Sequence, residues 1–164
     1  MNLESESEFD KKEFIQEYLI KNNITVATAE SCTGGNISKE FVEYAGISQV
    51  FLGGLCTYHN SVKMNVLGVK EETLNTKGAV SEECAFEMLQ GVKKVTGALA
   101  AVCTTGIAGP GGATKDKPVG LVYVGASFKD KTVIEKHIFK GNRKQVIEQA
   151  KQCALELLFK TIGG

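Results

Sequence analysis

Short apolar segments alternate with amphipathic segments along this chain, and this alternation limits most strongly which folds the chain can adopt. The predicted strands are 24–29, 50–58 and 98–104, and the predicted helices are 10–21, 36–44 and 81–96. Strands that alternate with helices form a sheet whose two faces the helices cover. In the helix at 36–44, we expect Ile37, Phe41 and Val42 to face inward.

The last part of the chain interrupts this alternation. Residues 120–128 and 132–139 predict two strands joined by the turn Lys129-Asp130-Lys131, and a final helix is predicted from 142 to 160. A short helix or turn at 62–67 ends at Gly68. Because a hairpin pairs its strands antiparallel, the sequence predicts an α/β fold: a three-layer α/β/α sandwich around a mixed β-sheet.

Length and charge limit the broad class of protein. The 164 residues fit a single domain, predicted here over 9–164, with a frayed tail at 1–8. Lysine plus arginine and aspartate plus glutamate are equal at 19 each, which argues against nucleic acid as a partner. We expect no membrane association, because no apolar run approaches the ~20 residues that span a bilayer. The acidic, polar N-terminus does not resemble a signal peptide, so a cytoplasmic location is predicted.

Cysteine spacing gives no indication of a metal centre. The five cysteines are scattered and form no Cys-x-x-Cys pair, so neither a zinc cluster nor a disulfide framework is predicted. Most of them lie in apolar surroundings and are expected to be small core residues. We expect neither a metal nor a cofactor.

A glycine-rich loop, Thr104 to Gly112, follows the apolar strand at 98–104. Its four glycines and one proline fall within seven residues. Such loops expose backbone N–H groups that hold a phosphate or a developing oxyanion, although a plain tight turn has the same composition. A second polar loop, Glu30 to Gly35, also follows an apolar strand. Two such loops indicate one site at the ends of strands.

Four polar residues outside the glycine-rich loop are candidates for chemistry. Ser31 stands at a strand-to-helix junction, where a serine is a nucleophile, a phosphate ligand or merely a helix cap. With only two histidines in the chain, a lysine is a credible base for a serine, and Tyr58 and Lys63 stand together where another strand ends. Otherwise Lys63 is a solvated surface lysine and Tyr58 a half-buried strand residue. Arg143 opens the last helix, where it is either a phosphate clamp or a surface charge.

Several segments together resemble the CinA C-terminal domain family, the nicotinamide-nucleotide amidases. The resemblance covers about residues 10 to 160, with the motifs in the family's order. The matching segments are Ala29 to Gly35, Tyr58 to Lys63, Leu67 to Val69, Gly78 to Glu83, Thr105 to Gly112, Lys117 to Gly120 and Gly141 to Arg143. Several long motifs in order are far more specific than one glycine-rich loop.

The resemblance implies a metal-independent, serine-type amidohydrolase that converts nicotinamide mononucleotide to nicotinic acid mononucleotide and ammonia. By that analogy Ser31 is the nucleophile, Lys63 the general base and Tyr58 an assistant in proton transfer. Ser48 is a rival nucleophile or a helper. The predicted substrate-binding residues are Glu30, Thr33, Gly34, Gly35, Ser48, Thr105, Gly106, Gly109, Gly111 and Arg143. The resemblance also implies a homodimer.

Two other classes of function remain open from the sequence. A nucleotide- or phosphate-binding module without turnover would share the same pocket. A structural or partner protein would use both loops as mere turns, and the many polar loop residues make this reading the least favoured.

Overall fold

The computed structural model describes residues 15–163. The predicted tail at 1–8 and the predicted helix start at Asp10 lie outside these residues. Residues 15–21 are helical. The elements that follow are β1 (Val26–Glu30), α2 (Asn36–Val42), the 3₁₀ turn η1 (Ile47–Gln49), β2 (Phe51–Cys56), α3 (Asn60–Leu67), α4 (Glu71–Thr76), α5 (Glu82–Thr96), β3 (Ala100–Gly106), β4 (Leu121–Phe128), β5 (Lys131–Ile138) and α6 (Arg143–Ile162).

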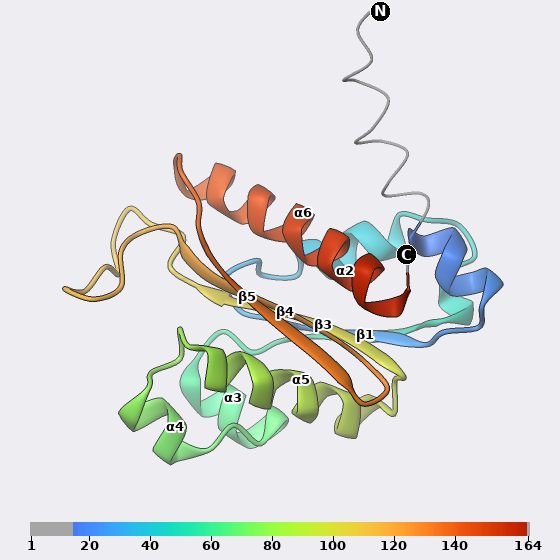
Figure 1. The fold of residues 1–164 in the computed structure, drawn as a ribbon, viewed down its shortest axis with the longest axis horizontal. Coiled ribbons are helices and arrows are strands. Elements are labelled where there is room, and N and C mark those ends of the chain that lie inside the picture. Colours follow the sequence, from blue (N-terminus) through green and yellow to red (C-terminus); the bar gives the residue numbers. More distant parts are fainter. Residues whose placement is uncertain (1–14, 164) are drawn as a thin grey trace, which may run out of the picture.

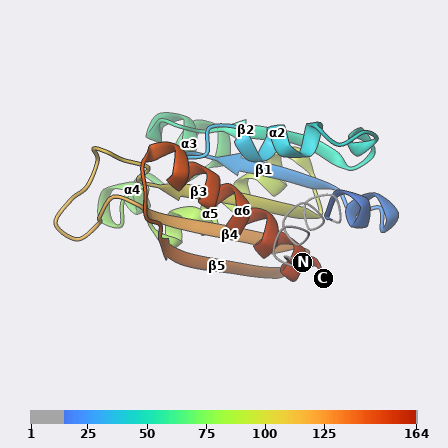
Figure 2. The same ribbon diagram turned by 90° about the horizontal axis from the view of Figure 1, so that it is seen from above.

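Within the described residues, five strands form one sheet in the order β2-β1-β3-β4-β5. β1 runs parallel to both β2 and β3, whereas β3–β4 and β4–β5 are antiparallel. The sheet is therefore mixed, and β4 and β5 form the predicted hairpin. Figure 2 shows the strands side by side, with the long loop between β3 and β4 projecting from one end.

Helices cover both faces of this sheet (Figure 1). On one face, α2, α6 and residues 15–21 enclose a core that includes Phe41, Val124 and Leu158. On the other face, α3, α4 and α5 enclose a second core that includes Met88 and Leu89. The predicted three-layer α/β/α sandwich is thus confirmed.

Local sequence signals fix the starts of the two long helices. The Ser81 hydroxyl accepts a hydrogen bond from the Cys84 N–H at the start of α5, as an N-cap does. Asn142 caps α6 in the same way and forms a reciprocal capping box with Gln145. The loops before these two helices run along the same end of the sheet.

Two details differ from the sequence prediction. Ile37 and Phe41 are buried as expected, but Val42 is exposed, because it lies about 100° around the helix from Phe41. The short helix α4 was not predicted. Its start is held by Glu87 of α5, whose carboxylate accepts hydrogen bonds from the Lys70 N–H at 2.8 Å and the Thr73 hydroxyl at 2.7 Å. Such a tertiary cap leaves no signal in the local sequence.

Among the described helices, none combines the length and the apolar character that crossing a membrane requires.

Candidate active site

The carboxyl ends of the three parallel strands lie at one edge of the sheet. The register pairs Glu30 of β1 with Cys56 of β2 on one side and with Thr104 of β3 on the other. The pairing extends beyond the strands, since the Ser31 N–H donates to the Thr104 carbonyl and the Thr57 N–H donates to the Glu30 carbonyl. The connection after β1 runs through α2 on one face of the sheet, and the connection after β2 runs through α3, α4 and α5 on the other face. Ligands of α/β sheets bind at such switch points.

Strand alternation decides which side chains of this edge meet. Ala27 and Ala29 of β1 pack into the core beside α5, so Ser31, two residues further on, faces α3 and α5. Glu30 faces the opposite side, toward α2. Two consecutive residues of one loop therefore serve different faces of the sheet.

Ser31 meets Lys63 on the α3 side. The Lys63 side chain is 1% exposed, and its Nζ lies 3.0 Å from the Ser31 Oγ. The same Nζ donates to the backbone carbonyls of Thr57, at 2.7 Å, and Tyr58, at 3.1 Å. Helix α3 orients the lysine, and His59 caps this helix by accepting from the Ser61 N–H.

No carboxylate forms a salt bridge with Lys63 in the described chain. Burial lowers the pKa of Lys63 below its ordinary value, and the nearby thiols of Cys84 and Cys32 oppose this shift. A neutral amine has two N–H donors and one lone pair. The two carbonyls match the two donors, which leaves the lone pair free to accept the Ser31 hydroxyl proton. The geometry therefore suits activation of a serine by a lysine.

Glu30 lies in a very different environment. Its carboxylate is fully buried and accepts six hydrogen bonds, from Thr28, Thr33, Gly35, Ile37 and both the N–H and the hydroxyl of Ser38. We predicted Glu30 as a substrate contact, but the structure places its carboxylate beneath the loop, where it holds the start of α2. Both of its oxygen atoms accept hydrogen bonds from the protein itself.

Thr33, Gly34 and Gly35 belong to the same supporting structure. The buried Thr33 hydroxyl bonds to Glu30 and to Thr104, both at 2.7 Å. Thr33 was predicted to bind substrate, and this arrangement turns its hydroxyl away from the surface. Gly34 and Gly35 have φ values of +58° and +98°, which glycine adopts without strain. These glycines let the chain turn sharply from β1 into α2.

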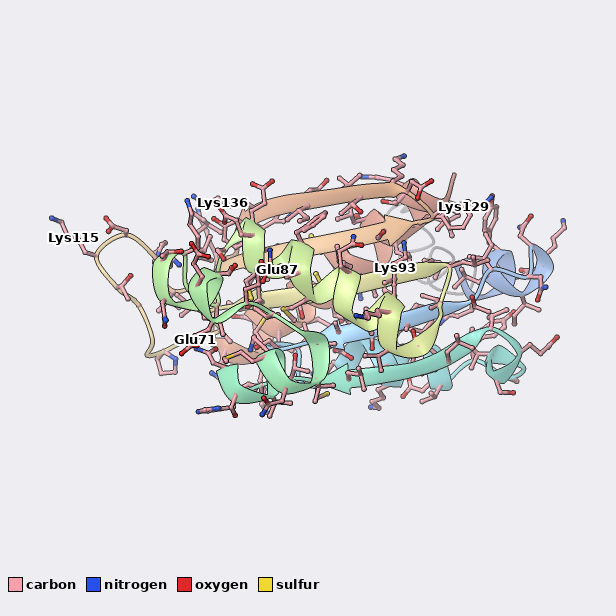
Figure 3. All side chains as sticks on the ribbon, turned by 90° about the horizontal axis from the view of Figure 1, so that it is seen from below. Glu71, Glu87, Lys93, Lys115, Lys129 and Lys136 are labelled. Carbon is pink, nitrogen blue, oxygen red and sulfur yellow. The ribbon has the colours of Figure 1, made fainter. Side chains whose placement is uncertain are left out.

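The glycine-rich loop lies at the same edge, beyond β3. The backbone N–H groups of Ala108, Gly109, Gly111 and Gly112 form no hydrogen bond within residues 15–163. They are therefore available to an anion, as expected for this loop. Figure 3 shows the following segment extending away from the body, with Lys115 near its tip.

Two residues at the base of this loop have packing roles. A Cβ at Gly106 would lie 2.6 Å from a Val122 methyl carbon, so glycine allows the close approach of β3 and β4. The Thr105 hydroxyl is buried and donates to the Ala79 carbonyl at 2.7 Å. Both residues were predicted to bind substrate. The structure packs Gly106 against Val122 and pairs the Thr105 hydroxyl with a backbone carbonyl.

Arg143 joins three of the predicted segments. Its guanidinium donates to the Gly109 carbonyl at 2.8 Å and to the Tyr58 hydroxyl at 3.1 Å. Arg143 and Tyr58 are both exposed, so this bridge forms a polar rim at the surface of the edge. A cation that contacts both the glycine-rich loop and Tyr58 is well placed to bind a phosphate.

The structure separates Ser48 from all of these residues. Ser48 lies in η1, before β2, whereas Tyr58 follows β2. Because β2 runs parallel to β1, Ser48 lies at the opposite end of the sheet from Ser31. The six residues of β2 span about 20 Å at ~3.3 Å per residue. The structure therefore does not bring Ser48, the predicted rival nucleophile or substrate contact, to the edge that holds Ser31.

Thr57 is a residue of this edge that the sequence reasoning missed. Its carbonyl binds the Lys63 Nζ, and its side chain is 1% exposed. The only available signal was its place between the strand and Tyr58, which is too weak to identify a role. Among the described residues, no group of three or more His, Cys, Asp and Glu side chains could hold a metal ion.

The fold and this edge define an α/β sandwich with a serine–lysine pair at the switch point of its mixed sheet. The sequence matches the model of the CinA C-terminal domain over residues 8–162. The chain therefore belongs to the CinA C-terminal domain family, as the sequence resemblance predicted.

Solved structures and curated relatives agree with this assignment. The competence/damage inducible protein CihA of Agrobacterium tumefaciens is 37% identical, has a TM-score of 0.87, and the match covers 93% of this chain and 96% of that one. A CinA superfamily protein of Escherichia coli has a TM-score of 0.91 at 26% identity, covering 98% and 93%. A protein of Clostridioides difficile named as competence-damage inducible is 50% identical over 142 residues, which are 87% of this chain and 34% of that protein. The chain thus spans about a third of the length of the curated relatives it matches.

Proposed function

We propose that this chain is an amidohydrolase that converts nicotinamide mononucleotide to nicotinic acid mononucleotide and ammonia. The observation that carries the proposal is the 3.0 Å contact between the Ser31 Oγ and the Lys63 Nζ. Lys63 is buried and forms no salt bridge with a carboxylate of the described residues. The choice of this substrate rests on the family resemblance. A binding module has no need of a buried lysine aimed at a serine, because burying an amine disfavours its charged form.

The first half of the reaction forms an acyl-enzyme. Lys63 takes the Ser31 hydroxyl proton as the oxygen attacks the carboxamide carbon. The C–N bond then breaks, and Lys63 gives the proton to the leaving nitrogen, which departs as ammonia. The N–H groups of Cys32 and Thr33 donate to no backbone carbonyl in the described chain, so they are candidates to stabilise the oxyanion.

The second half restores the enzyme. A water molecule attacks the ester carbon and gives one proton to Lys63. The bond between the acyl carbon and the Ser31 Oγ breaks, and Lys63 returns the proton to that oxygen. The carboxylic acid product leaves, and no other reactant is consumed.

The rest of the edge binds the nucleotide. The free N–H groups of the loop at 108–112 and the guanidinium of Arg143 hold the phosphate. The Tyr58 hydroxyl, which accepts from Arg143, lies at the rim and assists proton transfer to and from the substrate. The chain supplies these groups without net charge, because a local field suffices to attract an anion.

Ammonia release from nicotinamide mononucleotide tests this proposal. Purified wild-type protein is expected to release one ammonia for each nicotinic acid mononucleotide formed. The nucleoside without its phosphate serves as the matched substrate and is expected to react with a higher KM. If the wild-type protein releases no ammonia from the mononucleotide, the proposed function is wrong.

A further inference from the structure

The Thr57 hydroxyl is buried beside the serine–lysine pair and has no hydrogen-bond partner. Among the described residues, only two buried side chains have a polar atom in this condition, and the other is Gln16, in the helix before β1. An unpaired buried hydroxyl is costly, so native proteins rarely contain one without a reason. The Thr57 oxygen is therefore the unexplained polar atom at this edge of the sheet.

Its position places it next to Lys63. The Thr57 carbonyl accepts from the Lys63 Nζ at 2.7 Å, so the hydroxyl of the same residue is only a few bonds from that contact. Leu55, two residues earlier, packs into the core beside α5, so Thr57 faces the side on which Lys63 lies. Thr57 is also the neighbour of Ser31 in the extended register of β2 and β1.

The proposed reaction creates a need for another acceptor at this point. Once Lys63 has taken the Ser31 proton, its ammonium carries three N–H donors. The carbonyls of Thr57 and Tyr58 satisfy two of them. The third points at the Ser31 oxygen, which is bonded to the carboxamide carbon in the tetrahedral intermediate and is then a poorer acceptor.

We propose that Thr57 is a positioning residue whose hydroxyl accepts a hydrogen bond from the Lys63 Nζ when this amine carries the catalytic proton. The three N–H groups of the ammonium turn together, so a small turn or shift of the Lys63 side chain brings one of them to the Thr57 hydroxyl while another stays on a backbone carbonyl. The hydroxyl has no partner while the Lys63 amine is neutral, and it gains one when the amine is protonated. Its part in catalysis rests on the proposed function, whereas its contact with the ammonium does not.

The other ionisable groups that act on Lys63 are thiols. Cys84 lies on α5 and Cys32 on the loop after β1. Burial raises the pKa of each to about 11, so both are neutral near pH 7. Titration of Lys63 well below pH 11 is therefore not accompanied by a change in their charge.

The direct test is a titration of Lys63 by ¹³C NMR on protein labelled at the lysine Cε, with the signal assigned by its loss in Lys63→Arg. Thr57→Val keeps the shape of the side chain and removes the acceptor. Because the ammonium then loses a partner, the Lys63 pKa is expected to fall by about one unit, the size of one hydrogen bond. Thr57→Ser should restore the wild-type value. A matched control is Thr161→Val, which removes a buried hydroxyl of α6 that bonds to the Leu157 carbonyl.

An unchanged or raised Lys63 pKa in Thr57→Val overturns the inference. Thr57→Ala, which also lacks the hydroxyl, provides the same test if the valine variant does not fold. In the active protein, loss of the hydroxyl should move the acid limb of kcat/KM to lower pH and lower its plateau about tenfold, whereas a purely structural role would lower activity equally at every pH. If the wild-type protein shows no amidase activity, the proposed function fails, and the NMR titration still decides the Thr57 contact.

Discussion

Glu30 and Lys63 are buried ionisable side chains at the same edge of the sheet, but their surroundings differ. The Glu30 carboxylate accepts six hydrogen bonds from the protein. The Lys63 amine contacts two carbonyls and one serine, and it forms no salt bridge in the part of the chain described. Glu30 and Ser31 are consecutive, so strand alternation alone sends them to opposite faces of the sheet.

This difference distinguishes residues that stabilise the fold from residues that remain available for chemistry at such an edge. A charged group whose every lone pair is occupied is committed to the fold and has nothing left to offer a substrate. A buried amine with a lowered pKa and a serine as its third contact retains a reactive function. The four predictions that follow test this division, beginning with the largest effect.

Replacement of Lys63 by methionine should lower amidase activity by about 10²- to 10⁴-fold, the usual contribution of a general base. Initial rates of ammonia release from nicotinamide mononucleotide measure this loss. Lys39→Met is the matched control, because Lys39 is 71% exposed on α2 and should leave the rate unchanged. Equal rates in the two variants would remove Lys63 from the mechanism.

Replacement of Glu30 by glutamine should act on stability instead. The new amide group points two N–H donors at donors that now bond to the carboxylate, so the free energy of unfolding should fall by roughly 2–4 kcal/mol. Urea denaturation measures this, with the exposed Glu43→Gln expected to change it by less than about 0.5 kcal/mol. If Glu30→Gln left stability intact and abolished turnover by the folded protein, the division between the two residues would be reversed.

Arg143→Lys tests the rim that joins the loop, Tyr58 and α6. Arg143 uses two separate nitrogen atoms for the Gly109 carbonyl and the Tyr58 hydroxyl, and a lysine lacks both this planar fork and its bidentate contact with phosphate. We expect KM for nicotinamide mononucleotide to rise about tenfold, with a smaller change in kcat. Steady-state kinetics with Lys144→Ala as the neighbouring control would show this, and an unchanged KM would exclude a role in substrate binding.

The smallest effect is the pH dependence of stability that Lys63 produces. Its pKa is lowered in the folded chain, so the unfolded chain holds the proton to higher pH. Wild-type stability should therefore rise relative to Lys63→Met as pH increases toward the ordinary lysine value of about 10.4. Urea titrations of both proteins at matched pH cancel the contribution of the buried thiols. Wild-type stability that stays constant or falls relative to Lys63→Met as pH increases would mean that burial does not disfavour the charged lysine.

Much of the fold could be predicted because its signals are local. Apolar runs, the helix starts at Ser81 and near Asn142 and the hairpin turn each depend on neighbouring residues, and all appear in the structure. The start of α4 depends instead on Glu87, which is 17 residues from Lys70. The outward position of Val42 depends on where the helix face lies rather than on the presence of the helix.

The candidate site was harder to predict because composition does not reveal direction. Ser31, Lys63 and Tyr58 share motifs that the sequence displays, and the structure brings them to one edge. Glu30 and Thr33 stand in the same motif, yet alternation turns Glu30 to the far face, and the turn after β1 brings the Thr33 hydroxyl to its carboxylate. Ser48 precedes the strand that Tyr58 follows, so only the strand directions separate it from the site.

The central claim is that Ser31 at this edge is the nucleophile, and paired serine variants test it most directly. Ammonia release from nicotinamide mononucleotide should fall by about 10⁴-fold or more in Ser31→Ala, as loss of an activated nucleophile does. Ser48→Ala should keep the wild-type rate, because this serine lies at the other end of the sheet. A near-normal rate in Ser31→Ala would contradict the account.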